Sequence, residues 1–202
     1  MNLPFDLTVN QIMEIVIAGC GLGYLGLIAF EKKAGWWFGV AGSLLSVWLF
    51  IRVNLLAEAF LYLYYVWMGV YGYFHWKYGG RKEDRLRVTT RGPLFHIAVL
   101  AAGALLTVAA AQGLDYLGSE LIYADAASTV FSLIATWMTA RKILENWIYW
   151  IVIDAFSVWL YAQRELPIYA GLMALYSVLA VAGFFLWLGH YRETRSATPV
   201  SG

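Results

Sequence analysis

A shift of 111 residues lays the chain on itself without a gap, and this internal repeat limits the folds that the chain can adopt. The matched pairs are Trp36 with Trp147, Trp48 with Trp159, Trp76 with Trp187, Tyr65 with Tyr176, Gly72 with Gly183, and Glu14 with Asp125. A repeat this long in an apolar chain is typical of membrane transporters built from two related halves. In such proteins the substrate site lies near the midplane of the membrane, where the halves meet.

The composition places the chain among integral membrane proteins. Hydrophobic residues make up 61% of it and charged residues 13%, with a mean hydropathy of +0.64. About 20 helical residues cross a hydrocarbon core of about 30 Å, and seven segments come close to that length or reach it. They are residues 12–30, 34–51, 57–76, 93–111, 121–140, 146–162 and 167–189. We therefore predict an all-α protein with seven membrane-spanning helices.

Basic residues gather in alternate connections. One side of the predicted membrane holds Lys32, Lys33, Lys77, Arg81, Lys82, Arg85, Arg87, Arg91, Arg141, Lys142, Arg192 and Arg195, and the other holds only Arg52 and Arg164. Since positively charged loops stay in the cytoplasm, we expect the N-terminus outside and the C-terminus inside. The first positive residue is Lys32, which is too late for a cleavable signal peptide, so the first segment is expected to remain as a helix.

The repeat also predicts the topology. Each half has three spans, an odd number, so two halves joined directly would point in opposite directions across the membrane. The segment at 93–111 adds a fourth span that restores a parallel orientation, which gives a three-plus-one-plus-three arrangement. The expected parts are a first repeat at 1–78, a basic loop and linker helix at 79–115, a second repeat at 116–190 and a cytoplasmic tail at 191–202.

The sixth segment carries an acid inside the membrane. Trp147, Trp150, Asp154, Ser157 and Tyr161 recur every three or four residues and so share one helical face. An ionisable side chain within a membrane helix is costly unless it faces a cavity or a partner, and it is a functional candidate by default. The alternative is a structural Asp154 that is hydrogen-bonded to a neighbouring hydroxyl or amide.

A polar stripe on the fifth segment indicates a second wet surface. Asp125, Ser128, Ser132 and Thr136 follow one another at helical spacing. Single Ser and Thr residues can bond their own helix and remain silent, but four polar residues on one face favour a lining. Asp125 matches Glu14 in the repeat, and each either attracts a cation or is solvated at the membrane interface.

Aromatic residues are the third component of the expected site. The third segment is rich in them, and Tyr62, Tyr65 and the repeat-related Tyr176 lie deeper than an interfacial belt requires. Flat rings beside an acid suit a flat, positively charged heterocycle, because stacking and cation–π attraction add to charge pairing.

These residues also carry a resemblance to a known family. The run Tyr71-Gly72-Tyr73-Phe74-His75-Trp76, the acid at Asp125 and above all the run Arg141-Lys142-Ile143-Leu144-Glu145-Asn146-Trp147-Ile148-Tyr149-Trp150 resemble the Pnu family of bacterial vitamin transporters, whose motif reads R-K-x-x-E-N-W-x-x-W. The resemblance implies a fold like that of SWEET sugar transporters, in the bacterial inner membrane. It also implies facilitated diffusion of an unphosphorylated vitamin that a cytoplasmic kinase then traps. The family's amide and tryptophan pair carry over to Asn146, Trp147 and Trp150.

The substrate that the resemblance favours is nicotinamide riboside. Family members that carry it often have a Gln in the middle of the third helix and an Asn two turns later, where this chain has Tyr62 and Gly69. An aromatic site with fewer amides would also suit thiamine or riboflavin, which relatives carry. A further variant couples transport to protons through Asp154, since buried carboxyl groups can take up protons near neutral pH.

Other protein classes fit less well. A retinal protein needs a lysine in its last helix, and 167–189 has none, which argues against a seven-helix receptor of that kind. An intramembrane enzyme lacks support because His75, His96 and His190 are isolated and no nucleophile motif is present. We expect a vitamin and the lipid bilayer as partners, and no nucleic acid, metal or cofactor. Association into a homo-oligomer is left open.

Overall fold

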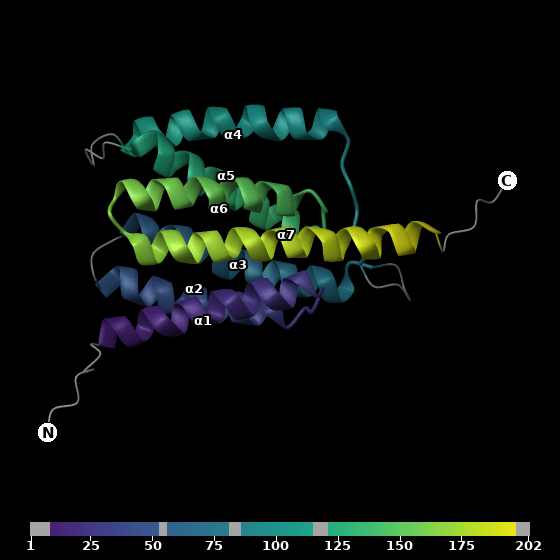
Figure 1. The fold of residues 1–202 in the computed structure, drawn as a ribbon, viewed down its shortest axis with the longest axis horizontal. Coiled ribbons are helices and arrows are strands. Elements are labelled where there is room, and N and C mark those ends of the chain that lie inside the picture. The colour runs from purple at the N-terminus through teal and green to yellow at the C-terminus, as the bar shows by residue number, and fades with distance from the viewer. Residues whose placement is uncertain (1–8, 53–55, 81–85, 115–120, 197–202) are drawn as a thin grey trace, which may run out of the picture.

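The computed structural model describes residues 9–52, 56–80, 86–114 and 121–196, and these residues form seven α-helices (Figure 1). The helices are α1 (Val9–Ala29), α2 (Gly35–Arg52), α3 (Leu56–Tyr78), α4 (Pro93–Leu114), α5 (Ile122–Ala140), α6 (Asn146–Gln163) and α7 (Pro167–Ser196). The seven expected helices are thus confirmed within the described residues. Arg81, Lys82 and Arg85 of the expected basic loop lie outside them.

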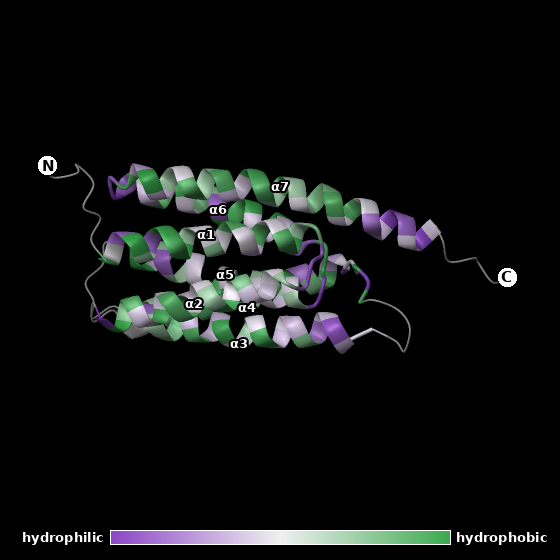
Figure 2. Cartoon of the chain, turned by 90° about the horizontal axis from the view of Figure 1, so that it is seen from below, coloured by the Kyte–Doolittle hydropathy of each residue, from purple (hydrophilic) through white to green (hydrophobic). Residues whose placement is uncertain are grey.

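Four of the described helices are long and apolar enough to cross a membrane: α1, α2, α4 and α7. Green apolar residues dominate most of these helices in Figure 2. The other three, α3, α5 and α6, contain Tyr62, Tyr65, the hydroxyl residues and Asp154 that the sequence predicted as a lining. These polar and aromatic residues lower the mean hydropathy of their helices.

The helices pack in two groups. In one group α2 packs against α1 and α3, and in the other α6 packs against α5 and α7. The groups meet where α3 packs against α5 and α1 packs against α7. Helix α4 packs against α5 at one edge of the bundle (Figure 1). Each group therefore gives its first and last helices to the contact with the other.

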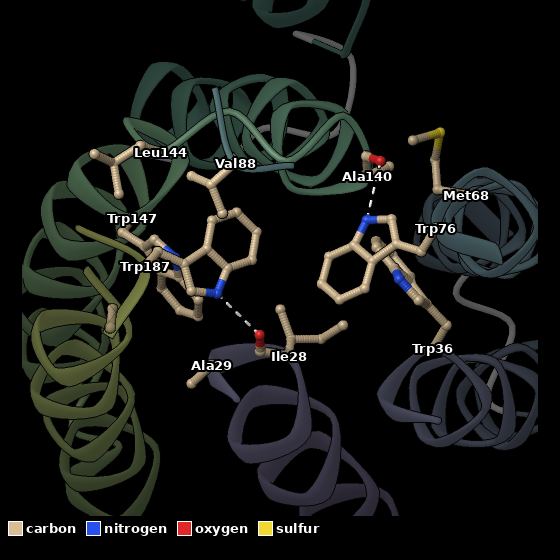
Figure 3. Close-up of a cluster of buried hydrophobic side chains, with 11 residues drawn as sticks. Ile28, Ala29, Trp36, Met68, Trp76, Val88, Ala140, Leu144, Trp147 and Trp187 are labelled. Atoms are coloured by element: carbon tan, nitrogen blue, oxygen red, sulfur yellow. Dashed lines mark hydrogen bonds between the residues drawn. The ribbon is translucent and has the colours of Figure 1, made fainter. Parts of the chain in front are cut away.

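Four tryptophans, Trp36, Trp76, Trp147 and Trp187, form a cluster where the two groups meet (Figure 3). Within each group a pair meets edge to face: the ring centroids of Trp36 and Trp76 are 5.5 Å apart at 90°, and those of Trp147 and Trp187 are 5.4 Å apart at 90°. Between the groups, the rings of Trp76 and Trp187 are 5.8 Å apart. We call these four residues the tryptophan cluster.

Hydrogen bonds join the tryptophan cluster to the opposite group in both directions. The indole Nε1 of Trp76, on α3, donates to the carbonyl oxygen of Ala140 on α5 at 3.1 Å. The indole Nε1 of Trp187, on α7, donates to the carbonyl oxygen of Ile28 on α1 at 3.1 Å. The two bonds, visible in Figure 3, link the last helix of each group to the end of the first helix of the other.

Helices α1 and α5 end in the same way. The amide of Lys32 bonds the carbonyl of Leu27 at 2.8 Å, and the amide of Ile143 bonds that of Met138 at 3.0 Å. These bonds form Schellman motifs, in which the residue after the helix is left-handed and usually glycine. Here these residues are Glu31, at φ 55°, and Lys142, at φ 52°. The conformation costs a side-chain-bearing residue about 1–2 kcal/mol.

Helix α7 extends further than the sequence indicated. The apolar pattern predicted an end near residue 189, but the helix continues to Ser196. The hydroxyl of Thr194 bonds the carbonyl of His190 at 2.8 Å, and that of Ser196 bonds the carbonyl of Arg192 at 3.0 Å. The polar extension is absent from a hydropathy count because it lies beyond the apolar part of the helix. Residues 197–202 of the expected tail lie outside the described residues.

Candidate functional site

Asp154 lies near the middle of α6, and its residue is only 6% exposed. Ser157, one turn further along the helix, is also buried. Within the described chain no Lys, Arg or His forms an ion pair with Asp154. Because a buried carboxylate is costly without a compensating partner, this position fits the sequence-based expectation of a functional acid.

Tyrosines lie on the helices that face this acid, and one of them, Tyr176, is close to it. The rings of Tyr62 and Tyr65, both on α3, are 5.5 Å apart and nearly perpendicular at 85°. Tyr176, on α7, is close enough to both Tyr62 and Asp154 to interact with them electrostatically. The structure thus brings together four predicted site residues from three helices.

Hydroxyl groups on two further helices join the tyrosines. The Tyr62 hydroxyl lies close to the side chain of Ser46 on α2, and the Tyr65 hydroxyl lies close to that of Ser132 on α5. Ser46 was not predicted as a site residue, although it pairs with Ser157 in the repeat register. We call Tyr62, Tyr65, Ser132, Asp154 and Tyr176 the central group.

The repeat register is visible in how two of these tyrosines are placed. Tyr65 reaches from α3 to Ser132 on α5, and Tyr176 reaches from α7 to Gly21 on α1. The two contacts are equivalent in the repeat: a shift of 111 residues takes Tyr65 to Tyr176 and Gly21 to Ser132. A Cβ atom at Gly21 would collide with the Tyr176 hydroxyl, so glycine is what lets this ring approach α1.

A chain of polar contacts fixes the start of α6. Asn146 is fully buried; its Nδ2 donates to the carbonyl of Ile143 at 2.7 Å, and its Oδ1 lies 2.9 Å from the hydroxyl of Thr139. The indole Nε1 of Trp150 donates to the same Thr139 hydroxyl at 3.3 Å. Asn146 and Trp150 therefore share the Thr139 hydroxyl, which also lies 2.9 Å from the carbonyl of Ala135. Sequence reasoning missed Thr139, which continues the stripe of Ser132 and Thr136 by one more turn.

Trp147 lies in the tryptophan cluster. Its residue is 0% exposed, and its ring contacts Trp187 in the tryptophan cluster. A Cβ atom at Gly183 would lie 2.6 Å from this ring. Its Nε1 has no hydrogen-bond partner among the described residues. In this conformation the Trp147 ring is covered by protein, whereas the Trp150 ring is only partly buried.

The remaining two predicted residues differ in their surroundings. Thr136 is buried on α5, and its hydroxyl donates to the carbonyl of Ser132 at 2.8 Å, so it bonds its own helix. Asp125 pairs with Arg164 at 2.6 Å, with both side chains about one-third exposed. Asp125 is in the first turn of α5 and Arg164 follows α6, which places this pair at a helix end, away from Asp154.

The central group offers aromatic faces, hydroxyls and one carboxylate. None of its members is basic, and the described residues contain no cluster of His, Cys, Asp or Glu that could hold a metal ion. Two hollows, of about 350 and 310 Å³, lie outside this group. The first is lined by Arg87, Val88, Thr89, Tyr191, Thr194 and Arg195, and the second by Tyr64, Val99, Ala102, Leu106, Leu133, Ile134 and Trp137. The chemistry of the central group suits a flat cation better than an anion.

Known proteins resemble the chain over most of its length. It is 24% identical to the nicotinamide riboside transporter PnuC of Escherichia coli, an alignment that covers 91% of this chain and 88% of the relative. The corresponding transporter of Haemophilus influenzae is 26% identical, with 83% of this chain and 75% of the relative covered.

A solved structure agrees in fold. The crystal structure of a vitamin B3 transporter, PnuC, superposes with a TM-score of 0.71 at 22% identity, and the match covers 91% of this chain and 83% of that one. The sequence model of the nicotinamide mononucleotide transporter family matches residues 11–189. The chain is therefore an integral membrane protein of the nicotinamide mononucleotide transporter family, the family of the PnuC transporters, as the resemblance to the Pnu family predicted.

Proposed function

We propose that the protein carries nicotinamide riboside across the bacterial inner membrane by facilitated diffusion. The observation that carries this proposal is the buried Asp154 close to Tyr176, which is in turn close to Tyr62. Among the described residues no Lys, Arg or His forms an ion pair with Asp154. The pyridinium ring of nicotinamide riboside is flat and positively charged. Aromatic stacking and charge pairing would both favour it.

The names of the family and of the relatives give two possible substrates. The family is named for nicotinamide mononucleotide, whereas the relatives are named for the riboside. The mononucleotide adds a phosphate, with a charge of about −1.5 to −2 at neutral pH. Burying that group beside Asp154, away from Arg or Lys, would be costly. The charge of the central group therefore favours the riboside.

The departures from the family pattern keep thiamine as a second candidate. Tyr62 stands where an amide was expected and lies in the central group, so that site is more aromatic. Gly69 has a different explanation: a Cβ atom there would lie 2.6 Å from Val40 on α2. The residue at position 69 faces α2, so its lack of an amide does not bear on the substrate. Thiamine is also a flat cation and suits the same acid.

The transport mechanism that we propose uses two parallel three-helix halves, 1–78 and 116–190, joined by α4 in a SWEET-like arrangement. The reciprocal packing of α3 on α5 and of α1 on α7 supports this assignment. So do the hydrogen bonds of Trp76 and Trp187, which cross between the halves in both directions. Rocking of one half against the other would expose the central group to each side in turn.

The orientation follows from charge. With the N-terminus outside, the ends of α1, α3 and α5 and the polar extension of α7 lie in the cytoplasm. A cytoplasmic kinase would phosphorylate the vitamin after entry, and the phosphorylated product would not fit the central group. This trapping would drive net uptake without ion coupling. Association of several copies is compatible with this mechanism and is not required by it.

Calorimetric titration of the purified protein in detergent tests the proposal. The ligands are nicotinamide riboside, nicotinamide mononucleotide, thiamine and riboflavin, and the variant is Trp150→Ala. Trp159→Ala is the matched control, because Trp159 is on the same helix but is 45% exposed. We expect saturable riboside binding that is at least tenfold weaker in the Trp150 variant, equivalent to about 1.4 kcal/mol, and unchanged in the control.

Each other outcome has a definite meaning. Preferential binding of thiamine would replace the riboside as substrate and keep the site. Tight binding of the mononucleotide would contradict the charge argument. Uptake into vesicles that stops when the proton gradient is collapsed would replace facilitated diffusion by proton coupling through Asp154. Absence of binding by a folded protein would reject the central group as a vitamin site.

A further inference from the structure

Glu31 and Lys142 face each other across the boundary between the two groups of helices. The Nζ of Lys142 lies 2.5 Å from Oε2 of Glu31, and the two residues are 111 positions apart, which is the repeat register. Lys142 is 5% exposed. The α1–α2 connection is thus joined to the α5–α6 connection by an ion pair between a buried lysine and a partly buried glutamate, whose side chain is 18% exposed.

Glu31 and Lys142 have the same backbone conformation. Both residues occupy the left-handed position of a Schellman motif, where glycine avoids any steric cost. Glu165, which follows α6, has this conformation too, at φ 57°, so the conformation alone does not require a charge. Glu31 and Lys142 differ from Glu165 because they carry opposite charges at repeat-related positions and contact each other.

Two further contacts hold the pair. The second carboxylate oxygen of Glu31, Oε1, lies 2.5 Å from Nδ1 of His190 on α7. The Nζ of Lys142 lies 4.5 Å from the centroid of the Trp76 ring, which gives a cation–π contact. Since Trp76 belongs to the tryptophan cluster, the ion pair and the cluster form one continuous contact between the two groups.

We infer that Glu31 and Lys142, with His190, form a gate that closes the cytoplasmic end of the transport pathway. This inference rests on the proposed function, because a gate requires a pathway through the central group. Opening this end must separate the α1–α2 connection from the α5–α6 connection, which breaks the ion pair. Opening hydrates both charges but gives up the ion pair, the contact with His190 and the cation–π contact with Trp76, so these contacts favour the closed state until the substrate shifts the equilibrium.

Charge exchange across the gate tests the inference. The background is the double variant Cys20→Ser and Ser132→Cys, in which the only thiol is in the central group. Labelling by a membrane-impermeant maleimide is measured from each side of oriented vesicles. In Glu31→Gln or Lys142→Gln we expect labelling from the cytoplasmic side to rise about tenfold, because loss of the pair raises the population of the open state.

The exchange variant E31K/K142E should label less than either single variant but more than the starting background, because it re-forms the ion pair and loses the contacts with His190 and Trp76. Lys33→Gln, in the same connection and exposed, is the control and should label like the background. The inference is overturned if both single variants label like the control.

A cross-link gives a second test that does not depend on the stability of the Gln variants. In the Cys20→Ser background, E31C/K142C is treated with a reducible bis-methanethiosulfonate reagent, whose spacer replaces the length of the Glu and Lys side chains, which a disulfide alone is too short to match. The cross-linked protein should lose uptake of whichever vitamin the wild type carries, and reduction should restore uptake. Unchanged uptake after cross-linking would overturn the gate. The labelling assay uses no vitamin, so a wrong substrate assignment leaves its result intact.

Discussion

At the scale of single residues, the two tryptophans that share a face of α6 with Asp154 have different surroundings. The same helical face holds Trp147 and Trp150, yet Trp147 is enclosed in the tryptophan cluster and Trp150 is only partly buried. One turn of helix thus separates a packing residue from a candidate ligand contact. Asn146 connects the two roles, because it is buried beside the cluster and shares the Thr139 hydroxyl with Trp150.

Asp154→Asn separates the charge of this residue from its shape. We expect the affinity for nicotinamide riboside to fall at least tenfold, or about 1.4 kcal/mol, because the positive ring loses its counter-charge. The free energy of unfolding should stay the same or rise, because the amide has no ionic desolvation penalty. Calorimetry and thermal unfolding in detergent measure the two effects. An unchanged affinity would show that Asp154 has a structural role only.

The placement of some of these residues could be predicted from the sequence, and that of others could not. Asp154, Tyr62, Tyr65 and Tyr176 were identifiable because ionisable and hydroxyl groups are rare and costly in membrane helices. Helical spacing alone could not show that Trp147 is enclosed and Trp150 is partly exposed, because both residues lie on one face of the helix. The role of Glu31 was missed because it lies in a connection, where charge is ordinary. Its opposite charge to Lys142 in the repeat register was the available signal.

At the scale of helices, glycines decide how closely α2 and α3, and α6 and α7, approach. A Cβ atom at Gly72 would lie 2.5 Å from the ring of Trp36. The related Gly183 meets Trp147 at a nearly equal distance, 2.6 Å. Small residues allow such contacts in membrane proteins, where packing replaces the hydrophobic effect. These glycines therefore set the position of the tryptophan cluster.

Gly72→Ala and Gly183→Ala should each lower the free energy of unfolding by about 1–3 kcal/mol, because the added methyl group overpacks a tryptophan ring. Gly171→Ala is the matched control: it is also in α7, and its Cβ atom would meet nothing within 4 Å. It should be neutral or stabilising by up to about 1 kcal/mol. Thermal unfolding in one detergent compares the three, and equal behaviour would contradict the packing argument.

The helices themselves were predictable because apolar length determines them. The expected and observed ranges agree within a few residues for α2, α5 and α6. The ends were less predictable: α7 continues to Ser196 because polar residues extend a helix as readily as apolar ones outside the membrane. The packing of α4 against α5 also could not be predicted, because a uniformly apolar helix has no face that identifies its neighbour.

At the scale of the whole molecule, the two groups of helices are held together by contacts that occur in related pairs. Trp76 donates a hydrogen bond to the end of α5, and Trp187 donates one to the end of α1. The donors are related by the repeat register, and their acceptors, Ala140 and Ile28, are one position out of register. A boundary built from paired contacts can be separated by one relative rotation of the groups. Such a motion is what a carrier with two access states requires.

This symmetry makes a quantitative prediction. Trp76→Phe removes the indole donor to the Ala140 carbonyl and should lower the free energy of unfolding by about 1–3 kcal/mol. Trp187→Phe should lower it by about 0.5–1.5 kcal/mol, because the Ile28 carbonyl still accepts from the Glu31 amide at 2.9 Å. Because the two bonds span the same boundary, they share one transition, and the double variant should depart from additivity by at least about 0.5 kcal/mol.

Trp76→Phe and Trp187→Phe should also have similar effects on access to the central group from the cytoplasmic side. Loss of either bond weakens the closed end, so cytoplasmic labelling of Ser132→Cys in the Cys20→Ser background should rise for both and should rise furthest in the double variant. Trp67→Phe, also on α3 but 63% exposed, is the control and should leave labelling unchanged. Additive stabilities together with labelling that changes in only one single variant would mean that the two groups do not move as related units.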